Sequence, residues 1–245
     1  MLYEPFAPEG FMWSWLRYHE KACPDLAAMN PFAVQALGCA LLNSALCVQL
    51  VDYPHPSPAT FYVMLIGPPK SGKGTLITNL QDWILELNRY RKLIANEDAT
   101  TLLRNLTAEG LKDALATHVW SKKQRKWREV GGTGPAFVLW PRMIPTKWTR
   151  TLAEALEEAY YARGLGQERI TEGARVRVEP YTYTLSAVFD LHPEHYTKVL
   201  RRLEAEWGLR RRILTVVMKG SLPDEGARPP EPAQEEMEVL EALAK

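Results

Sequence analysis

A glycine-rich segment has the residues that bind a phosphate chain. It spells G-x-x-x-x-G-K over 67–73 and continues with Gly74 and Thr75. Glycines let the backbone curl so that successive N–H groups face one anion, and the lysine reaches the β- and γ-phosphates of a nucleotide. The threonine can offer its hydroxyl to Mg²⁺. We predict that ATP and Mg²⁺ are bound by nine residues: Gly67, Pro68, Pro69, Lys70, Ser71, Gly72, Lys73, Gly74 and Thr75.

The residues around this segment predict the strand and the helix that such a site needs. The β-branched and aromatic run over 60–66 is typical of a strand that is covered on both faces, as in a parallel sheet. Leucine and isoleucine then recur at helical spacing between 76 and 87, which predicts a helix over 75–91. The positive end of that helix would face the same anion. This context favours a phosphate site over a simple glycine turn.

Hydrolysis of a bound triphosphate also needs an acid at the end of a neighbouring strand, where it holds Mg²⁺. The strand over 137–139 is the expected carrier, but it runs into Trp140-Pro141, and the segment 131–153 contains no acid. A later strand ends in Asp190. Asp190 is therefore the candidate catalytic acid, and with Thr75 the candidate Mg²⁺ ligand.

Other interpretations of the acidic residues remain open. Asp190 could instead be the N-cap of the helix that begins at Pro193, because aspartate is common at that position. Glu97 and Asp98, which follow the helix after the glycine-rich segment, are alternative acids. His192 and His195 are three residues apart without a carboxylate or cysteine to complete a metal site, so they are interpreted as ordinary surface histidines.

Two basic clusters suggest further contacts. Arg210, Arg211 and Arg212 lie between a helix and a strand. One of them could stabilise the transition state on a neighbouring subunit's nucleotide, or the cluster could be a solvated corner or a salt-bridge group. A hairpin is predicted with arms over 118–120 and 126–130, and its cations and tryptophans could bind nucleic acid. The candidate nucleic-acid-binding residues are Lys122, Lys123, Arg125, Lys126 and Arg128.

Strand and helix patterns alternate along the chain, which predicts an α/β fold with a mostly parallel sheet. The expected class is a P-loop NTPase with three layers, α/β/α, preceded by a small helical segment. Asn30 is expected to cap a long apolar helix that begins at Pro31. The expected organisation is a helical segment over 1–58 packed on the core, a core over 59–219, and an acidic, proline-rich linker with a tail helix over 220–245.

The charge distribution is consistent with an anionic partner but does not require one. From Ser221 onward there are seven acids and two bases, which leaves 28 bases and 22 acids before that point, a formal charge of +6. The start of the sequence lacks the pattern of a signal peptide, and polar residues interrupt the apolar stretch over 32–51. We therefore expect a cytoplasmic protein without a membrane partner.

These features together resemble the AAA+/RecA-type helicase-like ATPases of phages, plasmids and archaeal viruses. The resemblance extends from about Asn30 to Met218 and rests on the apolar helix before the glycine-rich segment, on a T-x-E-G-L-x-x-A-L pattern that begins at Thr107, and on a later strand, helix and arginine-bearing segment over 183–212. It implies an oligomeric protein that uses ATP and Mg²⁺ on DNA or RNA. That family has an acidic pair where this sequence has Trp140-Pro141.

Three functions follow as expectations. The first is an ATPase that acts as a nucleic-acid-associated motor or remodelling subunit, as a homo-oligomer or in a larger complex. The second is a degenerate P-loop protein that binds nucleotide with little hydrolysis and acts as a scaffold or regulatory subunit. The third is a nucleoside-phosphate kinase, because the loop spelling is similar to that of adenylate kinases.

Overall fold

The computed structural model describes residues 10–45, 60–94, 100–104, 106–121, 123–130, 134–165, 176–206 and 208–220. The predictions for Glu97, Asp98 and Lys122, and for the tail after Gly220, lie outside these residues. Within them no helix has both the length and the hydropathy to cross a membrane.

Helices and strands alternate after an initial helical unit. The elements up to the hairpin are α1 (Phe11–Ala22), α2 (Pro24–Met29), α3 (Pro31–Ala45), β1 (Tyr62–Ile66), α4 (Lys73–Ile94), β2 (Thr101–Arg104), α5 (Ala108–Ala114), β3 (His118–Ser121) and β4 (Lys126–Glu129). The later elements are β5 (Pro135–Met143), the 3₁₀ turn η1 (Pro145–Lys147), α6 (Arg150–Tyr160), β6 (Val176–Arg177), β7 (Thr184–Leu191), α7 (Pro193–Glu206), the 3₁₀ turn η2 (Gly208–Arg212) and β8 (Ile213–Val217).

The central sheet has five strands in the order β2-β5-β7-β1-β8, and all of its pairings are parallel. The predicted α/β class with a mostly parallel sheet is therefore confirmed. Ile66, at the end of β1, is in register with Leu191 of β7 and Val217 of β8, so these strands end at one edge of the sheet. We call this the carboxyl edge, and the opposite side the amino edge.

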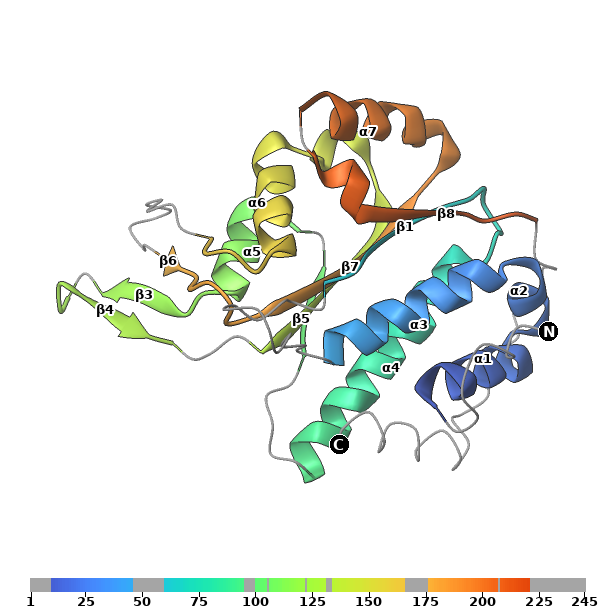
Figure 1. The fold of residues 1–245 in the computed structure, drawn as a ribbon, viewed down its shortest axis with the longest axis horizontal. Helices are drawn as coiled ribbons and strands as arrows, with labels where there is room; N and C mark the ends of the chain where they lie inside the picture. The colour runs from blue at the N-terminus through green and yellow to red at the C-terminus, as the bar shows by residue number, and fades with distance from the viewer. Residues whose placement is uncertain are drawn as a thin grey trace, which may run out of the picture.

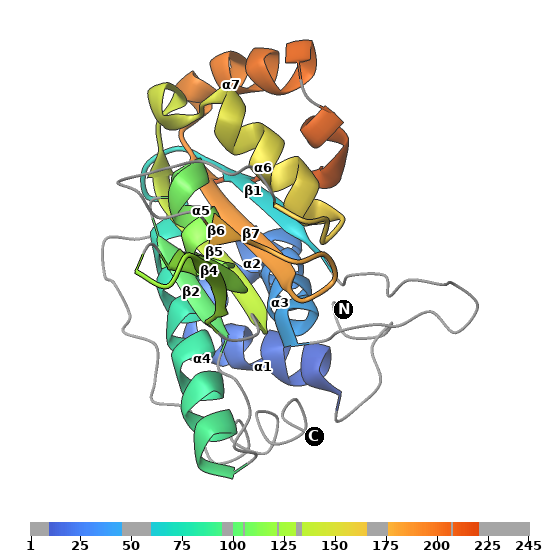
Figure 2. The same cartoon turned by 90° about the vertical axis from the view of Figure 1, so that its left-hand side faces the viewer.

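Helices cover both faces of this sheet (Figures 1 and 2). On β1, Val63 and Leu65 pack with residues of α1, α3 and α4 on one face. The alternate residues Tyr62, Met64 and Ile66 pack with residues of α5 and α6 on the other. The period-2 alternation of a strand explains why one apolar run serves two cores. The arrangement is compatible with a three-layer α/β/α architecture.

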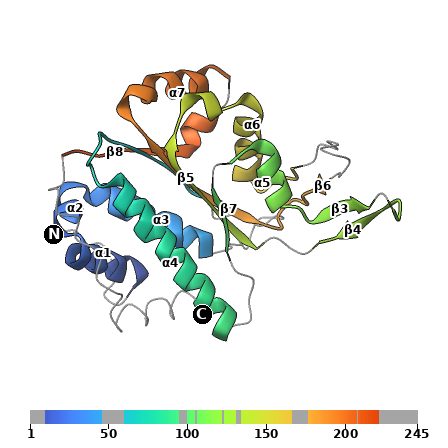
Figure 3. The ribbon, with the colours of Figure 1, turned by 180° about the vertical axis from the view of Figure 1, so that it is seen from behind.

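The predicted hairpin is confirmed as part of a second sheet, with antiparallel order β4-β3-β6. This sheet projects from the side of the molecule away from the end of β1, as Figures 1 and 3 show from opposite directions. Along the chain, β4 leads to the start of β5, and β6 leads to the start of β7. The hairpin therefore belongs to the amino edge.

Two strands differ from the sequence prediction. The strand β2 was not expected, because it is a four-residue edge strand whose side chains are half-buried or exposed. The strand β5 was expected to stop before Pro141 but continues to Met143. It does so through an irregularity in its pairing with β7 between Trp140 and Met143, since a bulge accommodates a proline that cannot donate to the ladder.

Candidate functional site

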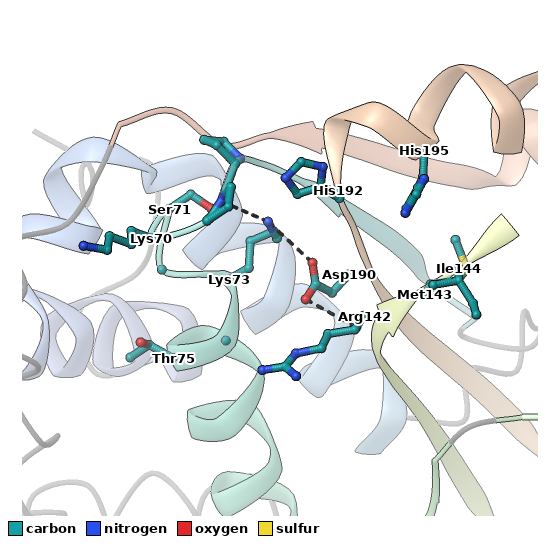
Figure 4. A pocket seen from close by; sticks show the side chains of 14 residues that line it. Lys70, Ser71, Lys73, Thr75, Arg142, Met143, Ile144, Asp190, His192 and His195 are labelled. Carbon is teal, nitrogen blue, oxygen red and sulfur yellow. Dashed lines mark hydrogen bonds and ion pairs between the residues drawn. The ribbon is translucent and has the colours of Figure 1, made fainter.

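The glycine-rich segment forms the loop between β1 and α4 and lines a pocket of about 640 Å³ at the carboxyl edge. Loop residues 68–75 form one wall, and the other side is lined by Arg142, Met143, Ile144, Asp190, His192 and His195. Figure 4 shows Met143, Ile144 and His195 across the pocket from the loop, with Lys73 and Asp190 between them. Eight of the nine predicted loop residues thus line one pocket, and Gly67 is buried and does not line it.

The position of the pocket follows from the strand connections. After β1 the chain passes through α4 on one face of the sheet, whereas after the adjacent β7 it passes through α7, whose Val199 packs on the other face. In open α/β sheets, ligands bind outside the carboxyl ends of strands at such a reversal. The fold therefore places the loop where a crevice is expected.

Two glycines of the loop are required by its shape. Gly72 has a φ of 85°, in the left-handed region that favours glycine. A Cβ on Gly67 would lie 2.6 Å from Ser71 Oγ and 3.0 Å from Met218 Cβ, so a larger residue would not fit without displacement. Gly74 differs, because a Cβ there would meet nothing within 4 Å.

Asn30 fixes the loop from outside. Its side-chain nitrogen donates to the carbonyls of Ser71, at 3.4 Å, and Lys219, at 3.1 Å, while its oxygen accepts from the Lys219 N–H at 2.8 Å. Asn30 directly precedes α3, as predicted for its N-cap, and its backbone carbonyl accepts from Ala33 and Val34, whereas its side chain makes the bonds to Ser71 and Lys219. A buried amide can bond several backbone groups at once, and these lie far away in sequence.

Lys73 and Asp190 meet in the pocket, and each residue is 8% exposed. Lys73 begins α4, and its Nζ donates to the carbonyls of Gly67 and Pro68 and lies 3.6 Å from Asp190 Oδ1. Asp190 Oδ2 accepts from the Arg142 N–H at 3.4 Å. Figure 4 shows the carboxylate between these two partners.

The side chain that contacts the first turn of α7 is His192 and not Asp190. His192 Nδ1, rather than Asp190, lies 3.4 Å from the Glu194 N–H. The interpretation of Asp190 as the N-cap of this helix is therefore wrong, because its two oxygens face Lys73 and Arg142. Asp190 lies within β7, in register with Leu65, which places it one residue before the end of that strand.

The pocket offers few ligands for a cation. Asp190 is its one carboxylate among the described residues, and Thr75, on the first turn of α4, lines it as well. In the described part of the chain, His, Cys, Asp and Glu residues form no cluster of three that could hold a metal. Mg²⁺ commonly binds through one or two carboxylates plus phosphate oxygens and waters, so Asp190 and Thr75 fit it only together with a phosphate ligand.

Three of the polar residues that line this pocket were not predicted as part of it. Arg142 stands near the tip of β5, where an acid was expected, with a φ of 53°. His192 and His195, interpreted from sequence as ordinary surface residues, both line the pocket with their ring centroids 6.3 Å apart. No local sequence pattern identifies these three residues, because the order of the strands in the sheet is what brings them close to the loop.

The arginine cluster lies at the other edge of the sheet. Arg210, Arg211 and Arg212 belong to η2, which leads into the start of β8. Arg212 is bound within the chain, with Nη1 3.1 Å from Glu157 Oε1 and Nε donating to Tyr161 Oη at 3.1 Å. The cluster is therefore remote from the loop of its own chain, and a role on a neighbouring subunit stays a prediction.

The basic hairpin also lies away from the pocket. Trp120 and Trp127 are cross-strand partners, and their rings meet edge to face with centroids 5.6 Å apart. Four of the predicted cations are exposed around them: Lys123, Arg125, Lys126 and Arg128. The two indoles already contact each other and are half-buried, so only part of each ring remains for a ligand.

Comparison with known proteins does not assign the chain to a family. No family model matches it, and no curated protein is significantly similar to it.

Proposed function

We propose that this chain is an ATP-binding P-loop protein with its nucleotide site in the pocket between the glycine-rich loop and β7. The observation that carries the proposal is the meeting of Lys73 with Asp190 across that pocket. A strand, a glycine-rich loop and a helix N-terminus converge there, which is the arrangement that binds phosphate through backbone N–H groups and the helix dipole.

The contacts indicate how a triphosphate would enter. Lys73 Nζ is bonded to two loop carbonyls and paired with Asp190. On binding, the ammonium would exchange these partners for the β- and γ-phosphates, since a charge-assisted bond to phosphate is stronger than one to a neutral carbonyl. Asp190 Oδ1 would then be free to hold Mg²⁺ with the Thr75 hydroxyl and the phosphates.

With Mg²⁺ at Asp190 the pocket would support ATP hydrolysis, and we propose an ATPase that acts as a nucleic-acid-associated motor or remodelling subunit. The exposed cations and the two tryptophans of the hairpin support contact with DNA or RNA. Arg210 or Arg211 would serve as a trans arginine in a homo-oligomer, because both are remote from the loop of their own chain.

A second function is favoured by Arg142. The tip of β5 carries this cation where hydrolytic P-loop proteins of the resembled type have acids. Without an acid at that position the site would bind a nucleotide and hydrolyse it slowly, as expected of a scaffold or regulatory subunit.

The test is to measure ATP affinity by calorimetry and ATP turnover with and without single-stranded DNA on the full chain. Lys73→Ala should weaken ATP binding about 100-fold through the loss of charge-assisted bonds. Lys198→Ala, which removes an exposed lysine of α7, should leave the affinity unchanged. An unchanged affinity in Lys73→Ala would overturn the site.

Turnover separates the candidates. Asp190→Asn should keep ATP binding and lose hydrolysis if Asp190 holds Mg²⁺. Tight ATP binding without turnover in the wild-type chain would support the scaffold instead, and conversion of AMP and ATP to ADP would support the kinase.

A further inference from the structure

The tip of β5 has a bulge that faces the pocket. Between its pairs with Phe189 and Leu191, β5 advances three residues, from Trp140 to Met143, where β7 advances two. Arg142 lies in this step with a φ of 53°. A left-handed conformation is unfavourable for a non-glycine residue, and strained residues and bulges are concentrated beside functional sites, where they redirect a side chain.

The bulge places both the backbone and the side chain of Arg142 at the pocket. Its N–H donates to Asp190 Oδ2 at 3.4 Å, and its side chain extends from the bulge on the loop side of Asp190 (Figure 4). Arg150, Arg163 and Arg212 each have a carboxylate partner. Within the described part of the chain, no ion pair includes Arg142, and the residue is exposed.

The balance of charge in the pocket favours a polyanion. Lys70, Lys73 and Arg142 line it together with the carboxylate of Asp190, but Figure 4 shows the Lys70 side chain pointing away from that carboxylate, so the remaining lining has a formal charge of +1 with neutral histidines. That carboxylate is already satisfied by Lys73 and by the Arg142 N–H. Arginine, lysine and Mg²⁺ are alternative cations for the charge of a phosphoryl group, and a guanidinium can bind two phosphate oxygens at once.

We infer that Arg142 binds the β- or γ-phosphate directly, so that the pocket accepts a triphosphate without Mg²⁺. The inference rests on the proposed nucleotide site and specifies its ligand as the metal-free polyphosphate. Mg²⁺ at Asp190 and Thr75 is then needed for turnover and not for binding.

The experiment measures the affinity of the full chain for ATP and for inorganic tripolyphosphate by calorimetry, once in EDTA and once with excess Mg²⁺. The wild-type chain should bind both ligands in EDTA with an affinity within about threefold of that in Mg²⁺. Arg142→Gln should weaken binding about tenfold in EDTA, and less in Mg²⁺, because the metal then neutralises part of the phosphate charge. Arg142→Lys should recover part of the loss.

Arg17→Gln is the matched control, because it removes one exposed arginine from α1, outside the pocket. Equal affinities of Arg142→Gln and Arg17→Gln in EDTA would overturn the inference, as would a wild-type chain that binds ATP only with Mg²⁺. In both cases the proposed nucleotide site would stand. If the wild-type chain bound ATP neither in EDTA nor with Mg²⁺, the proposed site and the inference would both be overturned.

Discussion

The two edges of the central sheet hold their charged side chains in different ways. At the carboxyl edge, Lys73 and Asp190 are almost fully buried and 3.6 Å apart, fixed by the start of α4 and the end of β7. At the amino edge, the hairpin cations are exposed, and Arg212 is already bound to Glu157. A buried charge pair fixes the position at which the charge of a ligand must lie. Exposed cations favour a negatively charged partner but do not fix its position.

The burial also indicates where substitutions will matter. Charges taken out of water interact strongly and tolerate little displacement, while exposed ion pairs contribute about 0–1 kcal/mol. We therefore expect substitutions at the carboxyl edge to change binding sharply and those at the amino edge to change it in small steps. The following predictions test this difference, from the largest effect to the smallest.

The first prediction concerns the buried His19, whose protonation sets the pH range in which variants of the two edges can be compared for stability. His19 is buried in α1 with Nδ1 2.9 Å from the Trp15 carbonyl, and burial lowers its pKa from 6.5 to about 4. The folded chain thus keeps His19 neutral while the unfolded chain protonates it below pH 6.5. About 3 kcal/mol of folding free energy, fully present above pH 6.5, should be lost as the pH falls to 4.

Urea unfolding at several pH values between 4 and 7 measures this loss. A His19→Phe variant should show a shallower dependence on pH, because phenylalanine does not titrate. An equal dependence in both proteins would contradict the assignment to His19. Above about pH 6.5 protonation of His19 no longer affects the free energy of unfolding, so variants of the two edges can be compared without its contribution.

The second prediction uses two glycines of the carboxyl edge. Gly67→Ala should lower the free energy of unfolding by about 2 kcal/mol, because its Cβ would collide with Ser71 and Met218. Gly74→Ala has open space and lies in the first turn of α4, so it should raise stability by about 0.5–1 kcal/mol. Thermal unfolding of both variants checks this, and similar effects would show that the loop is not closely packed at Gly67.

The third prediction concerns arginines of the amino edge. Arg212→Gln should destabilise the chain by about 1 kcal/mol, because it removes the contacts with Glu157 and Tyr161. Arg211→Gln, at an exposed position, should leave stability unchanged. Chemical denaturation compares the two variants. If Arg212→Gln instead kept full stability and abolished ATP turnover, this edge would act on a neighbouring subunit's nucleotide.

The smallest effect is expected at the hairpin. Lys123→Gln should reduce the slope of log affinity for single-stranded DNA against log salt by about 0.7, the contribution of one phosphate contact. Fluorescence anisotropy at several salt concentrations measures this slope. Lys112→Gln, on α5, is the control. Equal slopes for the two variants would show that Lys123 of the hairpin does not contact a nucleic-acid phosphate.

The sequence predicted those parts of the site that are contiguous in the chain. The glycine-rich segment is nine consecutive residues that run from the end of a strand into the first turn of a helix, and both of these elements have clear sequence patterns. Asp190 was identified because it follows an apolar run. The contact between Asp190 and Lys73 was not predicted, because it depends on β7 being the neighbour of β1 in the sheet.

Arg142, His192 and Asn30 show what local patterns miss. Arg142 reaches the pocket through a bulge at a proline that predicted the end of the strand. His192 lies there because β7 ends beside the loop. Asn30 fits a helix N-cap by every local rule, yet its side chain bonds residues 41 and 189 positions away. Register and long-range packing determine all three placements.

The Asn30 contacts also have a consequence for the order of folding. Ser71 and Lys219 are both held by the side chain of Asn30, directly before α3, so the loop has its final shape only when the segment after β8 is in place. Contacts between residues so distant in sequence form late, because closing a long loop of chain is entropically unfavourable. We expect a chain that emerges from the ribosome to become competent for nucleotide only after the segment that contains Lys219 has been synthesised. Pulse-labelled hydrogen exchange during refolding would contradict this if the loop amides were protected before those of β8.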